Sequence, residues 1–139
     1  EMFGENCVEL LDGMFALGIW DFKKKKLFLA RDRAGEKPLY YSYINGKFIF
    51  SSTIEAILSS NIFSFALNKQ AIWDFFTFLW VPEPATIFEE IYALLPGRIL
   101  IFSEDEKIKI CSYANKFGNF NKNKEKIENS IKNSVKKED

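Results

Sequence analysis

Three times along this chain, two apolar runs are joined by a short polar turn, and this pattern constrains the fold more than any other feature. The clearest turn is the Asn45-Gly46 pair, which is typical of a two-residue β-hairpin. The three pairs of runs are 14–22 with 26–32, 37–44 with 47–52, and 98–103 with 107–113. Three hairpins interspersed with helices predict an α+β fold with antiparallel sheets.

The first two hairpins carry apolar residues on both faces of their strands. A sheet with two apolar faces must be covered on both sides, by helices or by a second sheet. The run 14–22 is rich in large apolar residues, which predicts a strand buried on both faces. The lysines 23–26 are interpreted as a solvated hairpin tip rather than an anion-binding patch, because no arginine or aromatic residue is interleaved with them.

Helical patterns occur at four places in the sequence. Residues 7–13 resemble the end of a helix followed by Gly13, and residues 53–61 have the apolar spacing of a short helix. Asn68 can cap a longer helix over 69–80, whose narrow polar stripe predicts that it is mostly buried and stops at Pro82 and Pro84. Near the end of the chain, Ile127, Ile131 and Val135 are four residues apart, on one face of a further helix. Composition changes near residue 118, which predicts a domain boundary there.

Composition excludes several classes of function. The chain has 139 residues with 19 basic and 19 acidic side chains, so no net charge points to nucleic acid or an anionic membrane. It contains no histidine, which excludes histidine-based triads and argues against a zinc site. No apolar run reaches the roughly 20 residues that span a bilayer. The two cysteines, Cys7 and Cys111, are far apart and form no metal or disulfide pattern, which is typical of a reduced, cytoplasmic setting.

One strand pattern is interrupted in an unusual way, in the stretch LFLARDRAGEKPLYY at 27–41. Charged residues, Gly35 and Pro38 stand between two apolar runs. They can form a structural turn in which Arg31 and Asp32 provide charge-assisted hydrogen bonds. Alternatively, Arg31 or Lys37 can hold a carboxylate or phosphate of a ligand. Residue types alone leave both interpretations open.

Two stretches resemble a known family. GMFALGIWDFKKKKLFLARDRAGEKPLYY at 13–41 resembles a segment of class II glutamine amidotransferases. ALNKQAIWDFFTFLWVPEPATIFEEIYALLPGRILIF at 66–102 resembles the segment with a P-x-P-x-T-I-F box in glutamine-hydrolysing asparagine synthetases, and KIKICSY resembles the passage into their synthetase domain. The chain departs from the family pattern at Ala34, at Glu36 and in LLPG, which affects the detail of the turn.

The resemblance implies a fold and a reaction. Residues 1–117 are expected to be the C-terminal part of an N-terminal-nucleophile (αββα) glutaminase domain, and 118–139 a linker and the first helix of a synthetase domain. The family hydrolyses glutamine through a cysteine thioester and passes ammonia to aspartate, which ATP and Mg²⁺ activate as an acyl-adenylate. Glutamine, aspartate and ATP are thus the implied substrates, with no nucleic acid or membrane partner. The oligomeric state stays open.

The resemblance also implies that the reacting groups lie elsewhere. The family's catalytic cysteine and glutamine-binding residues would precede this chain, and its ATP-binding loop would follow Asp139. We therefore expect an internal fragment that is inactive alone, with no catalytic, cofactor-binding or metal-binding residue of its own. Cys7 is not expected to be the nucleophile, and Asn45-Gly46 is expected to be a hairpin turn rather than an oxyanion-binding pair. Sheet edges left uncovered by such a cut predict aggregation or poor folding.

What the resemblance assigns to this chain is a supporting role. Met14 matches a methionine along the family's ammonia channel, and ordinary core packing is the alternative. A related amidotransferase that acts on another carboxylate, or a truncated non-catalytic module, are the alternative functions. The residues expected to support the glutaminase core are Arg31, Asp32, Gly35, Lys37, Pro38 and Leu39.

Overall fold

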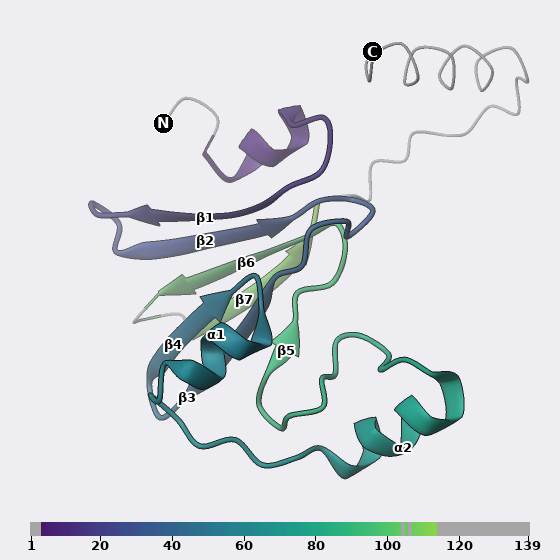
Figure 1. Ribbon diagram of the computed structural model, residues 1–139. Helices are drawn as coiled ribbons and strands as arrows, with labels where there is room; N and C mark the ends of the chain where they lie inside the picture. Colours follow the sequence, from purple (N-terminus) through teal and green to yellow (C-terminus); the bar gives the residue numbers. More distant parts are fainter. Residues whose placement is uncertain (1–3, 104, 106, 114–139) are drawn as a thin grey trace, which may run out of the picture.

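The computed structural model describes residues 4–103, 105 and 107–113, which form two antiparallel sheets (Figure 1). The first sheet has the order β1-β2-β6-β7, and the second has the order β4-β3-β5. The strands of the first sheet are β1 (Ala16–Asp21), β2 (Lys26–Arg31), β6 (Arg98–Ser103) and β7 (Lys107–Ser112). Those of the second are β3 (Tyr40–Ile44), β4 (Lys47–Ser51) and β5 (Tyr92–Ala93).

All three predicted hairpins are confirmed, as β1–β2, β3–β4 and β6–β7. In the first turn, the Asp21 carboxylate accepts hydrogen bonds from the backbone N–H groups of Lys23 and Lys24. In the second, Asn45 and Gly46 have φ values of 50° and 78°, as a primed two-residue turn requires. The two-residue strand β5 was not expected, because so short a segment carries no period-2 signal.

The two sheets pack face to face around one core. Because side chains alternate along a strand, Leu27 and Leu29 of β2 face the second sheet, with Leu100 of β6 beside them. Tyr41 and Phe48 of the second sheet pack against this cluster. The first two hairpins therefore belong to different sheets, each of which covers one face of the other.

A helical segment lies on the outer face of each sheet (Figure 1). The 3₁₀ helix η1 (Gly4–Leu10) places Val8 in a cluster with Ala30 and Ile99 of the first sheet. Helix α1 (Ile54–Ser59) packs along β4 and buries Ile57 completely. The order of layers is thus helix, sheet, sheet, helix.

Two predictions of burial are wrong. Strand β1 is not buried on both faces, since Ile19 and Trp20 are 49% and 43% exposed. Among the described residues, β1 is the last strand of its sheet and pairs with a strand on one side only. Its glycine, Gly18, nevertheless allows close contact between the sheets, because a Cβ there would lie 2.9 Å from the Phe50 ring.

Helix α2 (Lys69–Phe78) is the second case. Its predicted cap is confirmed, since the Asn68 side chain accepts a hydrogen bond from the N–H of Ala71. However, only Ala71 is fully buried, because α2 extends away from the sandwich and packs extensively on neither sheet (Figure 1). The helix ends at Phe78, where Leu79 adopts the left-handed conformation, before either proline. The predicted helix and domain boundary in 118–139 lie outside the described residues.

Candidate functional site

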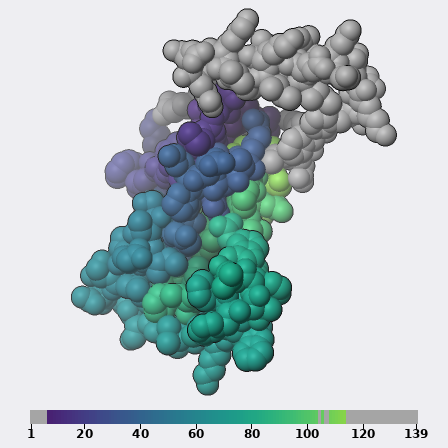
Figure 2. All heavy atoms as spheres, turned by 45° about the vertical axis from the view of Figure 1, so that its right-hand side comes forward, coloured from purple at the N-terminus to yellow at the C-terminus, as the bar shows by residue number. Residues whose placement is uncertain are grey.

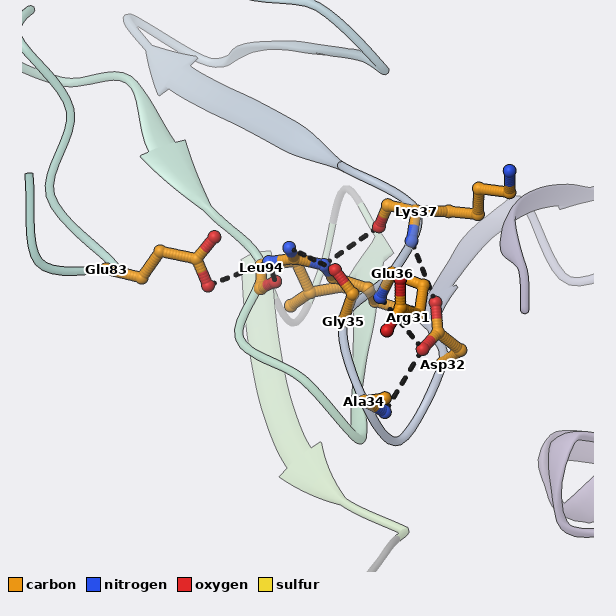
Figure 3. Close-up of polar contacts among 8 residues, drawn as sticks. All are labelled: Arg31, Asp32, Ala34, Gly35, Glu36, Lys37, Glu83 and Leu94. Atoms are coloured by element: carbon orange, nitrogen blue, oxygen red, sulfur yellow. Dashed lines mark hydrogen bonds and ion pairs between the residues drawn. The ribbon is translucent and has the colours of Figure 1, made fainter. Parts of the chain in front are cut away.

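The interrupted stretch forms the crossing between the two sheets. Strand β2 ends at Arg31, the chain turns through 32–38, and β3 begins at Tyr40. Figure 3 shows that the turn meets two distant segments, one containing Glu83 and one containing Leu94. Residues more than fifty positions apart in the sequence are therefore joined at this point.

Arg31 is 6% exposed and donates four hydrogen bonds. Its Nε donates to the Lys37 carbonyl at 2.9 Å, and its Nη2 donates to the Gly35 carbonyl at 2.8 Å. Its Nη1 donates to the Leu94 carbonyl at 2.7 Å and to the Glu83 carboxylate at 2.9 Å. A planar guanidinium is suited to this task because its donors diverge in fixed directions. Arg31 does hold a carboxylate, but that carboxylate belongs to the same chain.

Asp32 is 1% exposed and its carboxylate organises the turn itself. Oδ1 accepts hydrogen bonds from the N–H groups of Ala34 and Glu36, and Oδ2 accepts one from Lys37. Burial opposes ionisation of Asp32, but hydrogen bonds from the turn's backbone N–H groups, Lys37 foremost, outweigh it and hold its pKa below the ordinary value. The Asp32 carboxylate is therefore a negative charge whose position is fixed by backbone N–H donors of the turn.

Gly35 is required by both conformation and space. Its φ of +72° lies in the left-handed region, and a Cβ would lie 2.6 Å from Cγ of Pro96. The next residue in that second segment, Gly97, donates its N–H to the Asp32 carbonyl at 2.8 Å. The turn and the 94–97 segment are thus in direct contact.

The other three predicted residues contribute differently. Lys37 acts through its backbone, and its side chain is exposed, as is Pro38. Leu39 is 4% exposed and belongs to the inter-sheet core, while its carbonyl accepts a hydrogen bond from the N–H of Leu94.

Sequence reasoning missed two partners of this turn. Glu83 follows Pro82 in the proline-bounded segment, and Tyr113 ends the third hairpin. The Tyr113 hydroxyl donates to the Arg31 carbonyl at 2.8 Å, and burial raises the pKa of this phenol above its ordinary value. The Arg33 guanidinium lies 5.8 Å from the Tyr113 ring centroid. Glu83 and Tyr113 both lie within recognisable sequence patterns, but no local signal connects them to Arg31.

The remaining candidates lie away from the turn. Met14 is 63% exposed, just before β1, so it does not take part in core packing among the described residues. Cys7 packs beside Val8 under the first sheet, and both cysteines are free. Within 4–103, 105 and 107–113, no group of three or more Cys, Asp or Glu side chains could hold a metal ion. No helix in that part of the chain is long and apolar enough to cross a membrane.

The chemistry of the turn follows from this geometry. Both charged groups are buried, and their hydrogen bonds go to backbone groups and to Glu83. Such a cluster fixes the relative position of the two sheets and the proline-bounded segment. It does not present an activated nucleophile or an acid–base pair to solvent.

Residues 1–114 match the family described as "Glutamine amidotransferase domain". The chain belongs to this family.

Three relatives illustrate the range of similar proteins. Asparagine synthetase [glutamine-hydrolyzing] 3 of Bacillus subtilis is 37% identical over 73% of this chain and 17% of its own length. A putative asparagine synthetase [glutamine-hydrolyzing] 2 of Methanocaldococcus jannaschii is 36% identical over 75% of this chain and 21% of its own length. Amidase chyE of Penicillium rubens is 32% identical over 76% of this chain and 15% of its own length. The chain thus spans about a fifth or less of these relatives.

Proposed function

We propose that this chain supplies part of the glutaminase domain of a glutamine-hydrolysing asparagine synthetase. The protein hydrolyses glutamine to glutamate and ammonia, and the ammonia amidates aspartate that ATP and Mg²⁺ have activated. The family match over 1–114, together with relatives named for this reaction, carries the proposal. Two face-to-face antiparallel sheets with a helical layer outside each support an N-terminal-nucleophile fold for residues 1–117. Residues 118–139 are then the linker and first helix of the synthetase domain, in a cytoplasmic enzyme.

Within that domain, the turn around Arg31 supports the glutaminase site without touching glutamine. The support for this role is that Arg31 and Asp32 are buried and hydrogen-bonded to the chain itself. Catalysis depends on holding reacting groups within a fraction of an ångström, so a rigid crossing between two sheets has functional value. Met14 presents an exposed apolar side chain, which suits the wall of a channel that carries neutral ammonia.

A second candidate function is the amidation of a different carboxylate. The relative named as an amidase aligns over much the same share of this chain as the synthetases do. The match to this portion is therefore shared by a relative that is not named as an asparagine synthetase, and it does not by itself establish aspartate as the acceptor.

The test is an assay of the full-length protein that contains this chain. It is expected to release glutamate from glutamine and to form asparagine from aspartate, ATP and Mg²⁺, with ammonia able to replace glutamine. Glutamate release without asparagine, but with amidation of another acid, would establish the second candidate. No glutamate release under any condition would overturn both candidates and support a non-catalytic module.

The supporting role of the turn has its own test, the Arg31→Lys variant. A lysine keeps the charge but cannot reach three carbonyls and a carboxylate at once. Glutamine-dependent synthesis is expected to fall about tenfold or more, while ammonia-dependent synthesis changes less than about twofold. Arg33→Lys, an exposed arginine two residues away, is the matched control and should leave both rates unchanged. Equal loss of both rates in Arg31→Lys would show a general folding defect instead.

A further inference from the structure

Glu83 is the acidic partner of the buried Arg31 guanidinium, although it lies 52 positions further along the chain. Its Oε2 accepts a hydrogen bond from Nη1 of Arg31 at 2.9 Å, and the side chains of Arg31 and Glu83 are 7% and 29% exposed. The neighbouring Asp32 carboxylate is directed at N–H groups of its own turn instead. Among the described residues, Glu83 is therefore the carboxylate that balances the charge of Arg31.

The backbone around Glu83 is held in place independently of this ion pair. The carbonyl of the next residue, Pro84, accepts a hydrogen bond from the N–H of Ala93 in β5 at 2.9 Å. Strand β5 pairs with β3, so this segment is attached to the second sheet. The part of the chain that carries α2, in teal, protrudes from the lower part of the molecule (Figure 2). Glu83 thus presents its carboxylate from the side of the second sheet to Arg31 at the end of β2 (Figure 3).

The position of the Arg31 guanidinium affects the position of the turn that follows it. Its Nε and Nη2 donate to the carbonyls of Lys37 and Gly35, while Nη1 donates both to Glu83 and to the Leu94 carbonyl. Because the guanidinium is planar and rigid, a shift at Nη1 moves Nε and Nη2 as well. A carboxylate forms a stronger hydrogen bond with this cation than a carbonyl does, so Glu83 has the largest influence on where the guanidinium lies.

We propose that Glu83 is a positioning residue for glutamine hydrolysis, which acts through Arg31 on the turn 32–38. The inference rests on the proposed function, in which this turn supports the glutaminase site. Removal of the Glu83 charge leaves the buried Arg31 cation with backbone carbonyls alone, which is unfavourable. The guanidinium then shifts and carries the carbonyls of Gly35 and Lys37 with it. A small displacement of supporting structure is enough to slow a reaction that depends on near-attack geometry.

The test is Glu83→Gln in the full-length protein that contains this chain. Glutamine keeps the size of the side chain and one carbonyl acceptor, but it removes the charge. The kcat for glutamate release from glutamine is expected to fall about fivefold or more, while KM for glutamine and ammonia-dependent synthesis change less than about twofold. Added to Arg31→Lys, Glu83→Gln should cause less than about twofold further loss, because both changes act through the same guanidinium.

Two control variants separate this role from a general loss of charge or of stability. Glu89→Gln removes an exposed carboxylate six residues from Glu83. Ile57→Val removes a methyl group from a completely buried side chain of α1, which lowers stability without touching Arg31. Both controls are expected to leave the kcat for glutamine hydrolysis unchanged, with urea denaturation reporting the stability of each variant.

The outcomes that contradict the inference are distinct from failure of the proposed function. An unchanged kcat in Glu83→Gln would overturn the inference alone. So would an equal loss of kcat in Ile57→Val, which would indicate stability rather than positioning, or fully multiplicative losses when Glu83→Gln is combined with Arg31→Lys. No glutamate release by the unmodified protein would overturn the proposed function, and this inference with it.

Discussion

Arg31 and Asp32 are adjacent in the chain, yet their side chains stabilise different parts of the molecule. Arg31 reaches outward from the end of β2 to Glu83 and Leu94, whereas Asp32 collects the N–H groups of its own turn. The Arg31 guanidinium is paired with backbone carbonyls and the Glu83 carboxylate, and the Asp32 carboxylate is paired with backbone N–H groups. A buried charge without such partners would be strongly destabilising. One pair of residues therefore connects a local turn to long-range structure.

Gly35 offers a direct measure of how tightly this turn is packed. Gly35→Ala is expected to lower the free energy of unfolding by about 3 kcal/mol, from left-handed strain and overlap with Pro96 together. Gly46→Ala is the matched control, since its φ of +78° is similar but nothing lies within 4 Å of the new Cβ. It should cost only about 1 kcal/mol, from strain alone. Urea denaturation compares the two, and equal losses would show that the contact with Pro96 is unimportant.

At the scale of elements, predictions that depend on a few neighbouring residues are confirmed. Asn68 caps α2 as predicted, because a cap bonds an N–H only three positions away. Thr53 caps α1 in the same way, although no cap is predicted there. The Asn45-Gly46 turn forms for the same reason. Burial of an element is a different kind of property, because it depends on what other segments lie against it.

Helix α2 and strand β1 show this limit. The apolar periodicity of α2 is real, but it predicts only that the helix has an apolar surface to cover, not that the described residues cover it. The same limit applies to β1. Its Ile19 and Trp20 are exposed, as are Trp73 and Phe76 of α2, because an apolar pattern does not specify which segment covers it. An apolar edge strand is a template for pairing with another strand, so aggregation of the isolated chain stays a prediction.

At the scale of the whole molecule, the fold depends on pairing between β2 and β6, which are distant in sequence. This pairing makes β2 and β6 the two central strands and brings the 94–97 segment onto the turn. The interactions of Arg31 and Asp32 then stabilise the folded molecule as a whole, because they fix the positions of both sheets and of the segment that contains Glu83.

The lowered pKa of Asp32 makes this stabilisation depend on pH. A carboxyl group whose pKa is depressed by folding contributes stability above its ordinary value of 3.8, and this contribution is lost as the pH falls through the folded value. Asp32→Asn removes the charge and directs an amide donor at the N–H of Lys37. We expect a loss of about 2 kcal/mol at pH 7, measured by urea denaturation.

The same variant should converge with the unmodified protein in acid. As the pH falls through the depressed folded pKa of Asp32, its side chain becomes neutral like that of asparagine, so the difference in unfolding free energy shrinks. Asp21→Asn is the control, because Asp21 also accepts backbone hydrogen bonds but is only partly buried, and its effect should be smaller at every pH. A constant difference between pH 3 and pH 7 would show that the charge of Asp32 is not what stabilises the turn.

The sequence by itself determined the hairpins, the Asn68 cap of α2 and the antiparallel α+β class, and its motifs led to the family. These properties depend on the conformations and hydrogen bonds of residues close together in the chain. Only the tertiary structure decided that Arg31 binds Glu83, that the Tyr113 hydroxyl donates to the Arg31 carbonyl, and that α2 and β1 leave apolar surface exposed. Those facts depend on which distant segments meet, and no local preference carries that information.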